Sequence, residues 1–226
     1  MADLKDVIAK TQELISAPSG NSELNEKAQV WLKSIDTENE YAAAVDFVKV
    51  LESETVKDNK FAVAILSRKN LILNNALTDK IICSLQVIVT QLSQQSDGHL
   101  IQSRIFAGQG LTKLAEKYAE HSTEERGYVE KCIDRIIDLG GEVKLEDKKS
   151  APVYNDAEDF LKYDLQISKD GLNWLLDIVK LAQGDLTTFG ILSDYYKDEE
   201  KDMYETQQQL DLIKMIGKEN WLAKQI

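Results

Sequence analysis

The stretch of sequence that decides the fold is residues 111–139, LTKLAEKYAEHSTEERGYVEKCIDRIIDL. Its apolar residues recur every three or four positions, which predicts one long amphipathic helix with a single inward-facing stripe. The ends of that stripe are apolar, but its centre carries His121, Glu125 and Tyr128. A carboxylate that faces a protein core is costly unless it is paired or bound to a cation. The centre of this helix is therefore the first place to look for a functional site.

Three further long helices are predicted around this one. The expected helical ranges are 77–107, 110–139, 156–182 and 185–216, with a short last helix after Gly217. Gly140 and Gly141 are typical of a helix C-terminus. The polar segment from there through Asn155 is long enough to run the length of a helical bundle. Two helical hairpins joined by one long crossover form a recognised topology of all-α four-helix bundles.

The first 70 residues are interpreted as a separate small helical unit in front of the bundle, which would occupy residues 77–226. Apolar periodicity and turn residues predict its helices at 2–17, 22–35, 37–53 and 60–75. We find no motif in this unit that indicates chemistry. One interpretation is that the extension docks another protein.

Composition excludes several classes of function. The 226-residue chain has a formal net charge of −12, which argues against nucleic acid as a partner because phosphate binding needs clustered Lys and Arg. The first residues lack the apolar stretch of a secretory signal, and no apolar run approaches the length of a membrane span. Cys83 and Cys132 both lie in apolar helical patterns, so we expect buried free thiols in a reducing cytoplasm.

The other predicted helices also carry polar residues at inward positions. These are Gln91, Gln95 and His99 on the first, Ser168 on the third, and Tyr196, Glu199 and Asp202 on the fourth. Counting from the interhelix turns places Glu125 and Glu199 together near mid-bundle. His99 and His121 fall within about 5 Å of one axial level at a rise of 1.5 Å per residue. We expect His99 to be a hydrogen-bonded core residue rather than a metal ligand.

Short motifs in the second part of the chain point to a known family. They are Arg104-Ile105-Phe106, Gly110-Leu111, Ser122-x-x-Glu125, Asp134-Arg135-Ile136-Ile137-x-Leu139-x-Gly141, Asp198-Glu199-Glu200, Gln209-Leu210-Asp211-Leu212-Ile213 and Asn220-Trp221-Leu222-x-x-Gln225-Ile226. In these motifs the chain resembles the bacterioferritin-like branch of the ferritin superfamily, over about residues 77–226. The resemblance implies a ferritin-like four-helix bundle, iron handling and a homo-oligomer. We expect a dimer or another small oligomer rather than a full cage.

The resemblance also assigns roles to individual residues. The two glutamates that bridge a di-iron centre in the family fall on Glu125 and Glu199. The positions of the other ligands hold different residues, namely Gln91 or Leu92, Tyr128, Ser168 and Asp202. The methionine that binds haem in the family falls on Arg126, which cannot ligate iron, so no haem is expected.

The remaining donors suit iron or another divalent metal. The expected ligands are Glu125, Glu199, Asp202 and His121, and the expected neighbours are Tyr128, Ser168, Gln91, Gln95, His99 and Tyr196. Three interpretations of the centre stay open: a degenerate site of hydrogen-bonded glutamates, an altered one-metal site, and a working di-iron site. The protein is accordingly either an iron-handling protein of ferroxidase type or a non-catalytic bundle that acts through its N-terminal extension.

Overall fold

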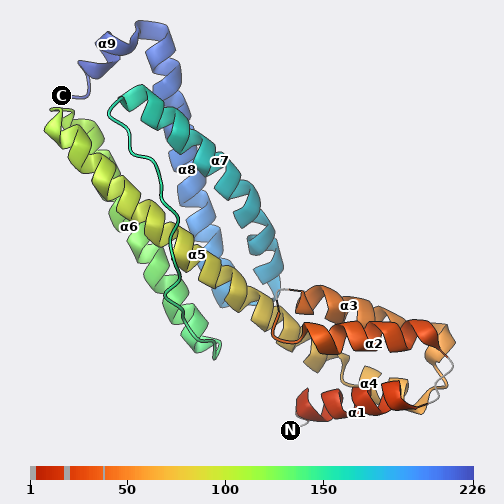
Figure 1. Cartoon of the computed structure of the whole chain (residues 1–226). Coiled ribbons are helices and arrows are strands. Elements are labelled where there is room, and N and C mark those ends of the chain that lie inside the picture. The colour runs from red at the N-terminus through yellow and green to blue at the C-terminus, as the bar shows by residue number, and fades with distance from the viewer. Residues whose placement is uncertain (1–3, 18–20, 38) are drawn as a thin grey trace. The chain divides into compact units, whose positions relative to one another are not determined.

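Figure 1 shows the computed structural model of the chain, which describes residues 4–17, 21–37 and 39–226. All regular elements in these residues are helices, which confirms the predicted all-α class. The α-helices are α1 (Leu4–Ser16), α2 (Ser22–Ser34), α3 (Glu40–Leu51), α4 (Lys60–Leu66), α5 (Lys69–Gly108), α6 (Thr112–Asp138), α7 (Ala157–Leu181), α8 (Leu186–Ile216) and α9 (Lys218–Leu222), with 3₁₀ turns at Glu54–Val56 and Ala182–Gly184. The chain divides into two compact units, Met1–Cys83 and Ser84–Ile226, and α5 contributes to both.

The first unit has its own apolar core, formed by α1 to α4 and the beginning of α5. Trp31 and Phe47 stack at its centre, with ring centroids 5.2 Å apart. The single helix predicted for residues 60–75 is wrong, because the structure has a break there. The N–H of Arg68 bonds to the carbonyl of Ile65 at 2.9 Å, and such an i→i+3 turn ends α4 before α5 begins.

The second unit contains the four long helices that the sequence predicts, each within a few residues of its expected ends except α5. Figure 1 shows α5 beside α6, α7 beside α8, and the crossover running along the bundle. Helix α6 ends where the glycines predict: Gly140 has φ +80°, and the N–H of Gly141 reaches back to the carbonyl of Ile136 at 2.9 Å. Helix α7 is capped by Asp156, whose carboxylate accepts from the N–H of Glu158 at 3.0 Å.

Glutamines of α5 hold the crossover in place. The side chain of Gln86 donates to the carbonyl of Lys144 at 3.0 Å and accepts from its N–H at 2.9 Å. Sixteen residues further along α5, Gln102 makes the same pair of bonds to Tyr154, at 2.7 and 3.1 Å. An irregular segment must satisfy its backbone polar groups outside regular structure. These glutamine side chains provide hydrogen-bond partners for the backbone of the crossover and so fix its path along α5.

The two cysteines are free thiols with different environments. Cys132 is buried, as predicted, whereas Cys83 is exposed, so the expectation that both are buried was wrong. At 3.6 residues per turn, Cys83 lies on the side of α5 opposite to the buried Ile81 and Leu85. Its apolar neighbours in sequence therefore do not place it in the core.

Helix α5 is also long and apolar enough to cross a membrane by length and composition, contrary to the expectation that no segment would be. This criterion is weak, because the core helix of a soluble protein meets it as well. In α5, 44% of the residues in the apolar window are buried inside the protein. The helix supplies Ile72 and Ala76 to the core of the first unit, and Phe106 to a core cluster of the second.

Candidate metal centre

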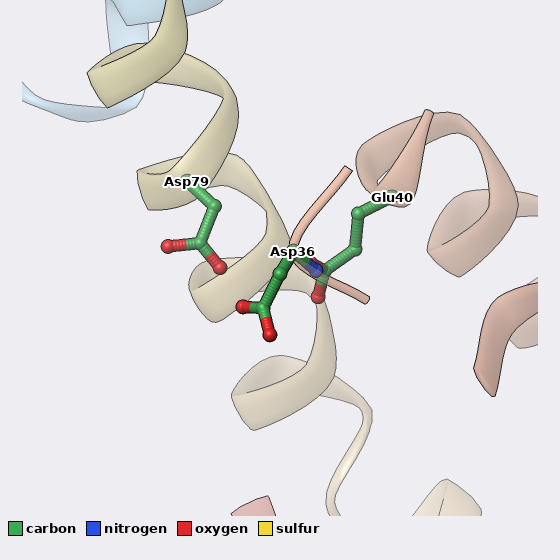
Figure 2. A group of neighbouring side chains, drawn as sticks. All are labelled: Asp36, Glu40 and Asp79. Atoms are coloured by element: carbon green, nitrogen blue, oxygen red, sulfur yellow. The ribbon is translucent and has the colours of Figure 1, made fainter. Parts of the chain in front are cut away.

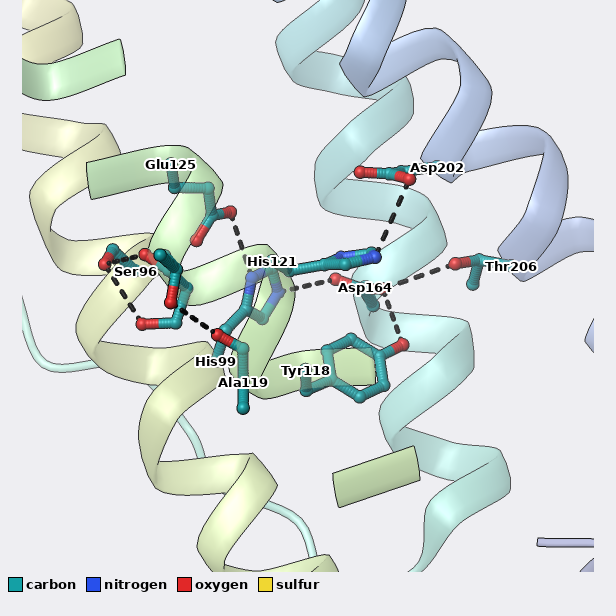
Figure 3. Close-up of polar contacts among 11 residues, drawn as sticks. Ser96, His99, Tyr118, Ala119, His121, Glu125, Asp164, Asp202 and Thr206 are labelled. Atoms are coloured by element: carbon teal, nitrogen blue, oxygen red, sulfur yellow. Dashed lines mark hydrogen bonds and ion pairs between the residues drawn. The ribbon is translucent and has the colours of Figure 1, made fainter. Parts of the chain in front are cut away.

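A polar cluster crosses the core of the second unit at the level that the sequence predicts (Figure 3). All four long helices contribute to it. Its members are His99 from α5, Tyr118, His121 and Glu125 from α6, Asp164 from α7, and Asp202 and Thr206 from α8. All of them except Asp202 are buried. Charged groups in such surroundings need partners, and the geometry shows which group pairs with which.

His99 lies between two carboxylates. Its Nε2 is 3.0 Å from Oδ1 of Asp164, and its Nδ1 is 2.9 Å from Oε1 of Glu125, in a close ion pair that is not aligned as a hydrogen bond. Burial opposes a charge on the ring, but Glu125 and Asp164 outweigh it and raise the pKa of His99 from 6.5 to about 10. The imidazolium has a proton on both nitrogens. His99 is therefore a fixed internal cation and offers no lone pair to a metal.

Asp164 is the main residue that sequence reasoning missed. Its Oδ2 accepts from the hydroxyl of Tyr118 at 2.9 Å and lies 3.5 Å from Thr206 Oγ1. Although burial works in the opposite direction, the hydrogen bond from His99 and the charge on its ring keep the pKa of Asp164 below its usual value. A signal was present in the sequence: Asp164 is one helical turn before the inward-facing Ser168. It is an ionised partner of His99.

His121 and Asp202 form a second pair, with Nε2 and Oδ1 3.6 Å apart. Burial, with Lys117 nearby, lowers the pKa of His121 to about 4. Burial raises the pKa of Asp202 to about 6. At neutral pH the imidazole is therefore neutral and the carboxylate is ionised, which are the forms that bind metal ions. Of the two histidines, His121 is the one in a ligand-competent state.

Glu125 and Glu199 are the two glutamates that the sequence places at mid-bundle. Burial and then the charge of Glu125 raise the pKa of Glu199 from 4.5 to about 8, and burial also raises the pKa of Glu125. The Oε2 atom of Glu125 is buried and has no hydrogen-bond partner among the described residues. Glu125 is paired with the His99 cation, whereas Glu199 lies near the charge of Glu125. With a pKa of about 8, Glu199 therefore holds a proton at neutral pH.

Gln91, Gln95 and Ser168 lie where the sequence predicts, close to the glutamates. Together with Glu199 they line one side of a cavity of about 300 Å³ between α5, α7 and α8. A hydrogen bond from Gln95 helps to hold down the pKa of Glu125, against the larger effect of burial.

The tyrosines lie differently from the prediction. The hydroxyl of Tyr196 is 3.5 Å from Glu200, away from Glu199. Tyr195 is the residue that bonds to Glu199, and its ring packs at a tilt of 39° against that of Tyr128, with centroids 5.0 Å apart. The hydroxyl of Tyr128 bonds in turn to Asp198. Successive residues of a helix point in directions 100° apart. An error of one residue in the predicted inward stripe of α8 is therefore enough to select Tyr196 in place of Tyr195.

One group of three carboxylates lies in the first unit (Figure 2). It consists of Asp36, Glu40 and Asp79, whose ligand oxygens, one from each carboxylate, all lie within 4.8 Å of one another. Among the described residues, this is the group of acidic, His or Cys side chains that is close enough to hold a metal ion. Glu40 Oε2 accepts from the N–H of Asp36 at 2.8 Å, and Asp79 accepts from Asn75 at 2.9 Å. These bonds give Glu40 and Asp79 structural partners. The four ligands predicted in the second unit do not form such a group in this arrangement.

A helical bundle with a belt of buried carboxylates and histidines defines the class of protein, and comparison with known proteins gives the family. Residues 83–216 match the ferritin-like domain, so the chain belongs to the ferritin-like family. A bacterial ferritin of Neisseria meningitidis serogroup B is 32% identical over 133 residues, which are 58% of this chain and 86% of the relative. A bacterial ferritin of Pseudomonas aeruginosa is 28% identical over 150 residues, which are 65% of this chain and 97% of the relative. A bacterioferritin of Brucella melitensis is 28% identical over 120 residues, which are 52% of this chain and 74% of the relative.

Proposed function

We propose that this ferritin-like protein binds ferrous iron and promotes its oxidation, for storage or detoxification, at an altered centre for one ion. The proposed ligands are Glu125, Glu199, Asp202 and His121. The ferritin-like family and its bacterial ferritin relatives support iron as the cargo. Carboxylate and imidazole donors suit Fe²⁺.

The observation that carries the proposal is the state of the Glu125–Glu199 pair. One buried oxygen of Glu125 has no partner among the described residues, and the pKa of Glu199 is about 8 because of burial and of Glu125. A divalent cation would displace the proton on Glu199 and satisfy that oxygen of Glu125. The neutral His121 and the ionised Asp202 would complete the donors from α6 and α8. His99 already neutralises part of the negative charge, which favours one ion over two.

The remaining expectations are part of the same proposal. We place the protein in the cytoplasm as a small homo-oligomer, with no nucleic acid or membrane as partner and with residues 1–70 docking another protein. We assign it no haem, because Arg126 forms an ion pair with Asp97 at 2.7 Å and offers no lone pair to iron.

Glu199→Gln tests the centre most directly. Glutamine keeps the volume of the side chain but cannot ionise, so we expect affinity for Fe²⁺ and the rate of its aerobic oxidation to fall by about tenfold or more. Anaerobic Fe²⁺ titration and the growth of ferric absorbance measure the two quantities. Glu200→Gln is the matched control, since Glu200 is the next residue on α8 and contacts Tyr196 instead.

A second candidate function is a non-catalytic bundle, and the His99 cation favours it because the core is already partly neutralised without a metal. Wild-type protein that binds no Fe²⁺ and oxidises it no faster than buffer would establish this alternative. Equal rates in Glu199→Gln and Glu200→Gln would remove Glu199 from the centre.

A further inference from the structure

The cavity beside Glu199 is lined by apolar residues together with a few polar ones. Its walls are apolar and come from α5 and α7, namely Ile88, Leu92, Leu172, Trp174 and Leu175. Its polar groups include Gln95, Ser168 and Glu199. A concave site with apolar walls and a few convergent polar groups is the usual form of a small-molecule site. At about 300 Å³ the cavity reaches the lower end of the size range of such sites.

The charges around the cavity define what it accepts. Glu199 and Asp170 line it, and among the described residues that line it there is no Lys, Arg or His. An anion is disfavoured because it would lie beside the Asp170 carboxylate and no lining cation would offset that charge. A free metal ion would gain nothing from the apolar walls. The lining therefore fits a neutral molecule with an apolar body and a single hydrogen-bonding head.

We propose that this cavity binds a small organic hydroperoxide, with its apolar body between α5 and α7 and its hydroperoxyl head toward Ser168 and Glu199. The inference rests on the proposed function, for which it names the oxidant. The head would then lie on the Glu199 side of the iron centre. Because the proposed centre holds one ion, the reduction would take two Fe²⁺ ions in succession. The first would supply one electron as the O–O bond breaks to an alkoxyl radical and hydroxide, and the second would reduce the radical. Solvent supplies two protons, so that the sum is ROOH + 2Fe²⁺ + 2H⁺ → ROH + 2Fe³⁺ + H₂O.

Binding is tested without iron by using the product alcohol, 2-phenyl-2-propanol, as the probe. We expect calorimetric titration of the metal-free protein to give saturable binding with a dissociation constant below about 1 mM. Gly171 also lines the cavity, and a Cβ there meets no atom within 4 Å. Gly171→Phe should therefore fill the mouth and weaken binding by about tenfold. Gly171→Ala is the matched control, because both changes raise helix propensity and only phenylalanine adds bulk.

Activity provides the second arm, with cumene hydroperoxide and hydrogen peroxide compared as oxidants of Fe²⁺. We expect Gly171→Phe to lower kcat/KM for cumene hydroperoxide by about tenfold and to leave that for hydrogen peroxide within about twofold. Absence of saturable alcohol binding to the wild type, or equal loss with both oxidants, would overturn the inference. Alcohol binding without iron oxidation by any oxidant would overturn the proposed function and the hydroperoxide, but would leave the cavity as a site for neutral amphiphiles.

Discussion

Replacing His99 with phenylalanine is expected to lower the free energy of unfolding by about 3–5 kcal/mol, because it leaves Glu125 and Asp164 buried without their shared cation. Phenylalanine suits the shape of the site, since the rings of Tyr118 and Phe160 lie 5.3 and 6.3 Å from the imidazole. The loss therefore reports charge rather than packing. Chemical denaturation at neutral pH measures it.

The chain contains its own control in the other histidine. His121 is also buried, but its pKa of about 4 makes it neutral, so His121→Phe should cost no more than about 1.5 kcal/mol. Adding Glu125→Gln and Asp164→Asn to His99→Phe should restore most of the lost stability, because the carboxylates are then gone as well. Equal losses in the two histidine variants would contradict the assignment of His99 as the internal cation.

The second large effect is a component of stability that the metal-free protein loses as pH rises and that Glu199→Gln lacks. The pKa of Glu199 is 4.5 in the unfolded chain and about 8 in the folded one, so its stabilising contribution is complete below pH 4.5 and is lost as pH rises through about 8. A single such group contributes a slope of up to about 1.4 kcal/mol per pH unit. Glu199→Gln removes that slope. Free energies of unfolding measured between pH 5 and 6.5 test it.

The chosen window separates Glu199 from its neighbours. Below pH 6.5, His99 is protonated in both the folded and the unfolded chain, so it adds little to the slope. His121, with a pKa lowered from 6.5 to about 4, contributes a slope of the opposite sign, and Asp202, with a pKa of about 6, contributes one of the same sign as Glu199. Both residues are present in Glu199→Gln and in Glu200→Gln. The difference between Glu199→Gln and Glu200→Gln therefore isolates Glu199. An unchanged slope would mean that Glu199 is ionised in the folded protein.

Most helices were predictable because helix formation depends on the local periodicity of apolar residues. Residues 112–138 carry one inward-facing stripe with apolar ends, and Gly140 follows it with the conformation that a helix C-terminus requires. The break before Lys69 was not predictable in the same way, because residues 60–75 are apolar enough to continue one helix. Cys83 was misplaced for a related reason: an apolar composition does not say which face of a helix a residue occupies.

The centre was only partly predictable. The positions of Glu125, Glu199 and His121 along the bundle axis follow from helix geometry, because each residue advances a helix by about 1.5 Å. The pairing of His99 with Asp164 does not, because these residues are 65 positions apart and meet only once the crossover has set the position of α7 against α5. The protonation states follow from that pairing. Sequence alone therefore located the belt and left its charges undetermined.

The imidazolium at the centre of this bundle also bears on how the protein matures. A bundle whose acidic core is neutralised only by bound metal must acquire its ion before its helices can close without electrostatic strain. In this chain one counter-charge is covalently attached, at a ring that contacts carboxylates from two other helices. We therefore expect the bundle to complete its folding without a bound metal ion.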